Sequence, residues 1–244
     1  MTIKRFRDLT LFDVEATTFL LACDSIGGIG AKEADVIKVS EEVVGYFLCR
    51  VPLMELLSQG VSPGVAVLTL ANEKTPTAEG VYRGVAMALE EIGIDPSMIL
   101  NGSTEENIPT IQTGIGITLI GATGKDFAFS SSPSGSQIYA LGIPKVGDAV
   151  LEDKGEIVPL ALITELKQNK DIFELLPVGS KGCIYEANEL ARTSGLRFKE
   201  ADTLPSWAHD SAGPACVVLA TVDHPDVLKG VEVPTTLLGT LVDA

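Results

Sequence analysis

The first part of the chain contains two short stretches dominated by apolar and β-branched residues, at residues 9–14 and 17–23. Two such runs joined by the dipeptide Glu15-Ala16 predict two strands connected by a tight turn. The second run is almost entirely apolar, which is typical of a buried strand. It is followed by residues 24–32, where three glycines precede Lys32, and we expect a loop there.

A helical pattern begins after Ser40. Apolar residues recur at helical spacing between residues 43 and 57, so we expect a helix that Ser40 caps and Gly60 ends. Pro52 lies inside this pattern and predicts a kink or a break into two helices, because proline lacks the N–H that a helix interior needs.

Strands and a second helix alternate in the rest of the first half. The helix is predicted from Thr77, as its N-cap, to about Ile92. The strands are expected at residues 65–71, 98–100 and 114–121, with a polar turn at 101–109. This order is typical of an α/β domain with a mixed sheet.

The composition changes at residues 122–136 to Gly, Ser, Lys and Pro, including the run Ser130-Ser131-Ser132-Pro133-Ser134-Gly135-Ser136. We interpret this segment as the boundary between two domains, 1–125 and 126–244. The second domain is predicted to contain a strand at 137–142, helices at 158–168 and 182–194, and strands near 197–201, 215–222 and 235–242. The sequence therefore predicts an α/β (α+β) fold in two parts.

The charge of the chain narrows the classes of partner. The formal net charge is -15, from 18 Lys and Arg against 33 Asp and Glu. A surface of this sign repels nucleic acid and anionic membranes, so we expect neither as a partner. The chain shows no signal-peptide pattern and no apolar window of membrane-spanning length, and its four cysteines form no C-x-x-C pair. We therefore expect a soluble cytoplasmic protein.

Asp24 and the glycine loop after it are the first candidate for chemistry. A carboxylate at the end of a buried strand, followed by Gly28, Gly30 and Lys32, suits a site in which Asp24 holds Mg²⁺ and Lys32 neutralises a phosphate. The spacing matches neither a P-loop nor a dinucleotide fingerprint. An ordinary glycine loop with a solvated lysine explains the same residues equally well.

A second candidate is the segment around Trp207 and Asp210. The two histidines, His209 and His224, have no partners for a catalytic triad or a zinc site. Trp207 is suited to stack on an aromatic base, with Asp210 as a catalytic carboxylate that orients or deprotonates an acceptor hydroxyl. The alternative is a loop that packs on the core.

Several motifs taken together resemble one superfamily, that of aminoimidazole ribonucleotide synthetase, thiamine-monophosphate kinase and selenophosphate synthetase. They are Arg7-Asp8-Leu9-Thr10, Asp24 with Gly30-Ala31-Lys32, Met54-Glu55-Leu56-Leu57-Ser58-Gln59-Gly60-Val61-Ser62-Pro63, Gly102-Ser103-Thr104, Ser211-Ala212-Gly213-Pro214 and Gly239-Thr240-Leu241. Within it, the chain most resembles the short bacterial α-ribazole kinases of cobalamin biosynthesis. The resemblance implies ATP and Mg²⁺ as cofactors, phosphorylation of the 5′-hydroxyl of α-ribazole, and a homodimer whose N-terminal strands form a barrel.

The resemblance also implies roles for individual residues. Asp8, Asp24 and Glu55 would be the magnesium-binding carboxylates. The nucleotide-binding residues would be Gly28, Gly30, Lys32, Thr104 and Glu106. The chain departs from the family at Glu55 and Ser103, where the family usually has an aspartate and an acidic residue, respectively.

Two further functions compete with the kinase. One is another ATP-dependent enzyme of the same superfamily, such as a synthetase or a thiamine-monophosphate kinase. The other is a non-catalytic ATP-binding assembly protein, which Ser103 and the short glycine loop at residues 178–182 favour.

Overall fold

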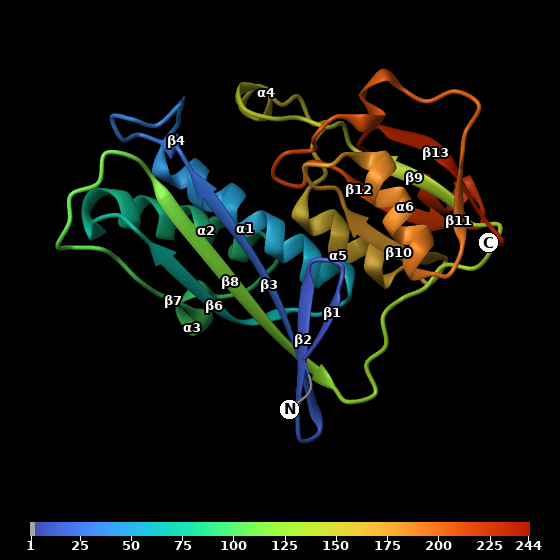
Figure 1. The fold of residues 1–244 in the computed structure, drawn as a ribbon, viewed down its shortest axis with the longest axis horizontal. Helices are drawn as coiled ribbons and strands as arrows, with labels where there is room; N and C mark the ends of the chain where they lie inside the picture. The colour runs from blue at the N-terminus through green and yellow to red at the C-terminus, as the bar shows by residue number, and fades with distance from the viewer. Residues whose placement is uncertain (1–2) are drawn as a thin grey trace. The chain divides into compact units, whose positions relative to one another are not determined.

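The computed structural model describes residues 3–244, which form two compact units (Figure 1). The first unit contains the chain as far as Phe127, apart from Leu57–Gly60. The second contains Ala128–Ala244 together with those four residues.

The first unit is built on a six-stranded mixed sheet. Its strands lie in the order β1-β2-β3-β8-β6-β7. Their bounds are Ile3–Phe6 (β1), Leu9–Val14 (β2), Thr17–Gly27 (β3), Pro63–Leu70 (β6), Leu100–Ser103 (β7) and Gly114–Gly124 (β8). Neighbours pair antiparallel except β6 and β7, which are parallel. Two very short strands, β4 (Ile29–Gly30) and β5 (Ile37–Lys38), pair with each other in the loop after β3.

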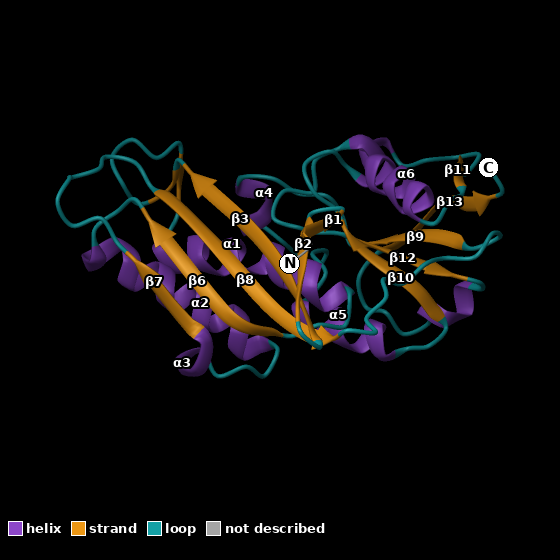
Figure 2. Cartoon of the chain, turned by 60° about the horizontal axis from the view of Figure 1, so that its bottom comes forward, coloured by secondary structure: helices purple, strands orange, loops and turns teal. Residues whose placement is uncertain are grey.

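Two long helices, α1 (Glu41–Ser58) and α2 (Glu79–Glu91), lie on one face of this sheet (Figure 2). They approach each other closely, because a Cβ at Gly45 or at Gly84 would collide with the backbone of the other helix. The π-helical segment η1 (Lys74–Ala78) leads into α2, and the one-turn helix α3 (Pro96–Ile99) precedes β7.

The two faces of the sheet differ in exposure. Along β3, Leu20 and Ala22 are buried, whereas Cys23, the next residue after Ala22, is exposed. Along β6, Val65 and Val67 are exposed to 42% and 36%. Since side chains alternate along a strand, one face forms the core with the helices and the other is open. We call this second surface the open face.

The second unit contains a five-stranded antiparallel sheet in the order β10-β12-β9-β13-β11. Its strands are β9 (Gln137–Leu141), β10 (Ile172–Pro177), β11 (Arg197–Glu200), β12 (Val218–Val222) and β13 (Thr235–Val242). Its helices are α4 (Asp148–Leu151), α5 (Leu160–Gln168), α6 (Cys183–Thr193) and the short 3-10 segments η2 (Ser206–His209) and η3 (Pro225–Leu228).

The expected fold class is confirmed, with several corrections in detail. Pro52 does not divide the first helix, since α1 is one element. Asp24 lies within β3 rather than in a loop, because pairing with β8 continues to Gly27. Thr77 does not cap α2; its hydroxyl donates to Glu73. Strands β1 and β10 were not expected at all. The strand expected at residues 98–100 begins only at Leu100, because residues 96–99 form the helix α3, and it continues to Ser103 into the expected turn.

The N-cap predicted at Ser40 is present, with its hydroxyl accepting from the Val43 N–H at 3.5 Å. Within residues 3–244, no helix combines the length and the apolar character needed to cross a bilayer.

Candidate functional site

A pocket of about 740 Å³ lies in the first unit, at the carboxyl ends of the parallel strands β6 and β7. It is lined by Ser25, Thr69, Leu70, Ala71, Ser103, Thr104, Glu105, Ile108, Thr110, Gly114, Ile115 and Gly116. Its volume falls in the range of about 300–1,000 Å³ that is usual for small-molecule sites. The carboxyl ends of parallel strands are also where open α/β sheets commonly bind ligands.

The lining of the pocket is rich in hydroxyl groups and contains one charged side chain. The hydroxyls belong to Ser25, Thr69, Ser103, Thr104 and Thr110. A hydroxyl both donates and accepts, so this wall suits sugar or phosphate oxygens. The charged side chain is Glu105, and none of the residues that line the pocket is a lysine or an arginine.

Glu105 is held in its ionised form by the backbone beside it. Its Oε1 accepts from the N–H groups of Asn107 at 2.7 Å and Ile108 at 3.3 Å. The hydrogen bond from the Asn107 backbone lowers the pKa of the Glu105 carboxyl, against the opposing effect of desolvation. The pocket therefore carries one fixed negative charge.

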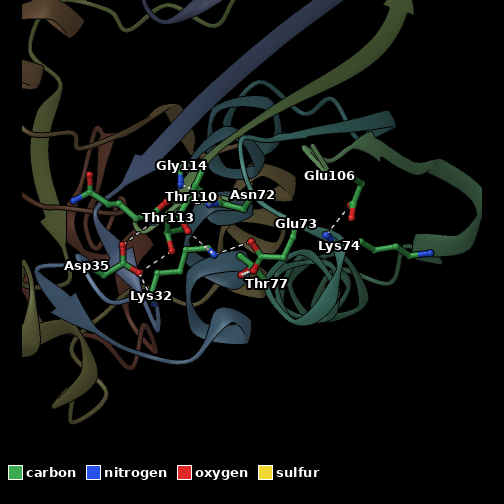
Figure 3. Close-up of polar contacts among 11 residues, drawn as sticks. Lys32, Asp35, Asn72, Glu73, Lys74, Thr77, Glu106, Thr110, Thr113 and Gly114 are labelled. Carbon is green, nitrogen blue, oxygen red and sulfur yellow. Dashed lines mark hydrogen bonds and ion pairs between the residues drawn. The ribbon is translucent and has the colours of Figure 1, made fainter. Parts of the chain in front are cut away.

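Lys32 lies behind the pocket wall and is already engaged (Figure 3). Its Nζ donates to Glu73 Oε2 at 2.7 Å and to the carbonyl of Thr110 at 3.0 Å, and its side chain is 14% exposed. Because Thr110 lines the pocket, only this residue separates the ammonium group of Lys32 from the pocket. A phosphate would have to compete with Glu73 for this charge.

The predicted glycines Gly28 and Gly30 are explained by packing within the loop. The Gly28 N–H donates to the carbonyl of Thr113 at 2.9 Å. A Cβ at Gly30 would lie 2.5 Å from Thr113 Oγ1 and 2.8 Å from Asp35 Oδ2. No side chain fits there, so these glycines let the loop approach the start of β8.

Asp35 joins that loop to β8 from a buried position. It is 5% exposed and accepts from the N–H of Thr113 at 2.8 Å, the hydroxyl of Thr113 at 2.7 Å and the N–H of Lys32 at 2.9 Å. Burial alone would raise the pKa of this carboxyl, but these hydrogen bonds and the charge of Lys38 lower it. Asp35 was not among the residues predicted from sequence.

Thr104 and Glu106, both predicted to lie near the phosphates, are brought together. The Thr104 hydroxyl donates to Glu106 Oε1 at 2.7 Å, and the same oxygen accepts from the N–H of Lys74 at 2.8 Å. Thr104 lines the pocket, whereas Glu106 does not. Glu106 therefore links the turn after β7 to the start of η1.

Asp24 precedes the pocket residue Ser25 on β3, but the alternation of exposure places the two side chains on opposite faces. Asp24 continues the row of Leu20 and Ala22, while Ser25 lies on the open face. Burial raises the pKa of the Asp24 carboxyl, and the Ser25 N–H partly offsets this. Asp24 is thus a half-buried acid beside the pocket rather than in its wall.

Strands β2 and β3 are antiparallel, with Thr10 opposite Leu21. Asp8, just before β2, therefore lies at the same end of this strand pair as Asp24. Glu55 is half-buried on α1. Across residues 3–244, no group of three or more His, Cys, Asp or Glu side chains is arranged to hold a metal ion. The magnesium roles of Asp8, Asp24 and Glu55 stay predictions.

Asp210 and Trp207 belong to the second unit. The segment η2 ends at His209, and the Asp210 N–H donates to the carbonyl of Trp207 at 2.9 Å. A Cβ at Gly182, which precedes α6, would lie 2.9 Å from the carbonyl oxygen of Asp210. Asp210 is therefore an exposed acid next to the first turn of α6, and its catalytic role stays a prediction.

Three residues of the site were missed by the sequence reasoning, namely Asp35, Asn72 and Glu73, whereas Glu105 lies in the polar turn expected at residues 101–109. A single residue separates Asn72 and Glu73 from the end of the apolar strand β6, and this change from apolar to polar near a strand end was the available signal. Nothing local in the sequence indicates that their partners lie about 40 residues away.

Comparison with known proteins supports the fold. The structure of thiamine monophosphate kinase from Aquifex aeolicus matches 98% of this chain and 90% of its own, with a TM-score of 0.66 and 19% identity. The complex of AaThiL with AMPPCP and TMP matches 97% and 85%, with a TM-score of 0.62 and 18% identity. HypE from E. coli, a hydrogenase maturation protein, matches 92% and 80%, with a TM-score of 0.66 and 14% identity.

No protein-family model matches the sequence, and no curated protein matches it. At these identities, the likeness establishes that the chain shares the fold of these proteins.

Proposed function

We propose that this protein is an ATP-dependent phosphotransferase that acts on a small molecule. The observation that carries the proposal is the hydroxyl-lined pocket at the carboxyl ends of β6 and β7. It lies in a chain that shares nearly its whole fold with AaThiL, whose complex contains the ATP analogue AMPPCP and TMP. Phosphoryl transfer asks a protein mainly for positioning and charge neutralisation, which such a wall can provide.

Mg²⁺ fits this proposal if it binds as a complex with the nucleotide. A nucleotide-bound magnesium needs only one or two protein carboxylates, because phosphate oxygens and water complete its octahedron. Glu105 supplies an ionised carboxylate in the pocket wall, and Asp24, with Asp8 at the same strand end, supplies acids nearby. When bound, the metal would neutralise phosphate charge.

The chain's own groups would then share the remaining work. The hydroxyls of Ser103, Thr104 and Thr110 orient the nucleotide by hydrogen bonds. Lys32, currently paired with Glu73, offers a positive charge immediately behind Thr110. Asp24 is proposed as the acid whose removal abolishes turnover.

For the acceptor we propose α-ribazole, following the sequence motifs. Trp207 would stack on its benzimidazole, and Asp210 would orient or deprotonate its 5′-hydroxyl. Under this assignment Trp207→Ala raises KM with a smaller change in kcat, because stacking stabilises ground and transition states alike. Asp210→Asn lowers kcat instead.

The direct experiment is incubation with ATP, Mg²⁺ and α-ribazole, followed by mass spectrometry for ADP and α-ribazole 5′-phosphate. Thiamine monophosphate and purine precursors are tested in parallel. Phosphorylation of one of these, and none of α-ribazole, would assign the protein to another reaction of the same fold. If ADP release never depends on an added acceptor, the protein is a nucleotide-binding module and not a kinase.

A further inference from the structure

Asn72 lies two residues beyond the end of β6 and is fully buried, with 0% of its surface exposed. Its side chain makes three hydrogen bonds. The Nδ2 group donates to Thr110 Oγ1 at 2.7 Å and to the carbonyl of Gln112 at 2.9 Å, and Oδ1 accepts from the N–H of Gly114 at 2.9 Å. Its backbone carbonyl accepts from the N–H of Glu105 at 3.0 Å.

Three of these partners line the pocket, although Asn72 itself does not. Thr110 and Gly114 belong to the segment that enters β8, Glu105 belongs to the turn after β7, and Ala71, next to Asn72, ends the β6 wall. Figure 3 shows Asn72 beside Thr110 and Gly114 of this segment. With the bond from Glu105 to its backbone carbonyl, this one buried residue connects the end of β6 to the turn after β7 and to the start of β8.

A primary amide is well suited to this position. The position needs two donors directed at Thr110 and Gln112 and one acceptor directed at Gly114. The carboxamide of asparagine supplies both donors and the acceptor. Aspartate has the same shape but loses both donors when ionised, and it would place a charge against the carbonyl oxygen of Gln112. A buried polar group left without its partner is costly, so the wall would rearrange.

The opposite side of the same segment is fixed independently. Asp35 binds the N–H and the hydroxyl of Thr113, so residues 110–114 lie between two buried side chains that approach from different parts of the chain. Lys32 adds a third bond, to the carbonyl of Thr110. Loss of Asn72 would therefore release the wall on the pocket side without detaching the segment as a whole.

We propose that Asn72 is the positioning residue of the pocket: its side-chain amide sets the placement of Thr110 and Gly114 and thereby determines how tightly the pocket binds a magnesium–nucleotide. This inference rests on the proposed function for the identity of the ligand. The positioning itself rests on the hydrogen bonds of the free protein.

The test uses the full chain with Asn72→Asp and Asn72→Ser, titrated with Mg²⁺ and AMPPCP by calorimetry. The serine variant introduces no buried charge and so covers the case in which the aspartate variant does not fold. Each variant is expected to bind at least ten-fold more weakly than the wild type. Lowering the pH from 8 to 5 should narrow this gap for Asn72→Asp, because a protonated aspartic acid regains one donor.

Val85→Ala is the matched control, since Val85 is fully buried on α2 and does not line the pocket. It should lower Tm while leaving the affinity for AMPPCP within two-fold of the wild type. Wild-type affinity in both Asn72 variants would overturn the proposal. So would an equal loss of affinity in Val85→Ala, because the effect would then follow general stability.

A wild type that fails to bind AMPPCP would refute the proposed function, not the positioning. The positioning is measured separately by hydrogen exchange at the Gly114 amide in the free protein. Faster exchange in Asn72→Ser than in Val85→Ala supports it, and unchanged exchange overturns it.

Discussion

Lys32 and Glu73 form a 2.7 Å ion pair between the loop that follows β4 and the segment that follows β6. The two residues are 41 positions apart in the chain. Their side chains are 14% and 29% exposed, so the pair is largely shielded from water. It closes the back of the pocket wall at Thr110.

Removing the charge of Glu73 should have opposite effects on stability and on nucleotide binding. Burial would raise the pKa of the Glu73 carboxyl, but the hydrogen bonds from Lys32 and Thr77 lower it overall. A lowered pKa stabilises the fold above the unfolded value of 4.5, and this contribution is lost as the pH falls through the folded value. Glu73→Gln should therefore cost about 1 kcal/mol at pH 7 and less than that at pH 3, as measured by urea unfolding.

The same variant frees the ammonium of Lys32 for a phosphate, so AMPPCP should bind more tightly to Glu73→Gln. Lys32→Met, which keeps the length of the side chain and removes its charge, should bind more weakly. If both variants shift the affinity in the same direction, Lys32 does not contact the phosphates.

Asp24→Asn should abolish turnover and leave the protein at least as stable as the wild type. Burial raises the pKa of the Asp24 carboxyl, so ionising it costs free energy that asparagine avoids. The stability of the wild type should fall as the pH rises from 3.8 through the folded pKa, and the variant should lack this step. We expect a Tm gain of no more than about 4 °C at pH 8. Activity near that of the wild type would exclude Asp24 from the site.

Asp35→Asn should be destabilising, in contrast to Asp24→Asn, because Asp35 accepts three hydrogen bonds that lower its pKa. An asparagine would replace one of the two accepting oxygens with an NH₂ group, which cannot accept a hydrogen bond from the N–H or hydroxyl group that faces it. A loss of about 1–3 kcal/mol is expected at pH 7, shrinking as the wild-type carboxyl is protonated in acid. The measurement is urea unfolding at pH 7 and pH 3, with Asp95→Asn, at an exposed helix cap, as the matched surface control.

The open face of the first unit predicts a homodimer. Phe12 and Phe19 pair across β2 and β3 on this face, with stacked rings 5.1 Å apart. Apolar surface and strand edges of this kind are usually covered. Light scattering should give twice the 25.7 kDa chain mass at micromolar concentration.

Phe19→Asp should yield a monomer, because it places a charge on the apolar part of the open face formed by Phe12 and Phe19. Met98→Asp serves as the control, since Met98 is 79% exposed on α3 and lies outside the sheet. A monomeric wild type would contradict the assignment of this face.

The sequence alone predicted most of the elements that carry the site. The apolar runs at 9–14 and 17–23 became β2 and β3, and the periodicity after Ser40 became α1, since local hydrophobic patterning decides which residues can face a core. The hydrophobic pattern did not predict β10, because Glu174 interrupts the apolar run there. This carboxylate is only 2% exposed and accepts from the hydroxyl of Ser132 at 2.8 Å, a partner 42 positions away.

Tertiary structure decided the partners of the polar side chains. The sequence contains Lys32 and the glycines, and it does not reveal that Glu73 neutralises the lysine or that Gly30 makes room for Asp35 and Thr113. Nor does it place Asn72 behind the pocket. Hydrophobic burial follows a period along the chain and can be read locally. A hydrogen bond depends on direction and on which distant backbone the fold brings near, and only the assembled sheet determines that.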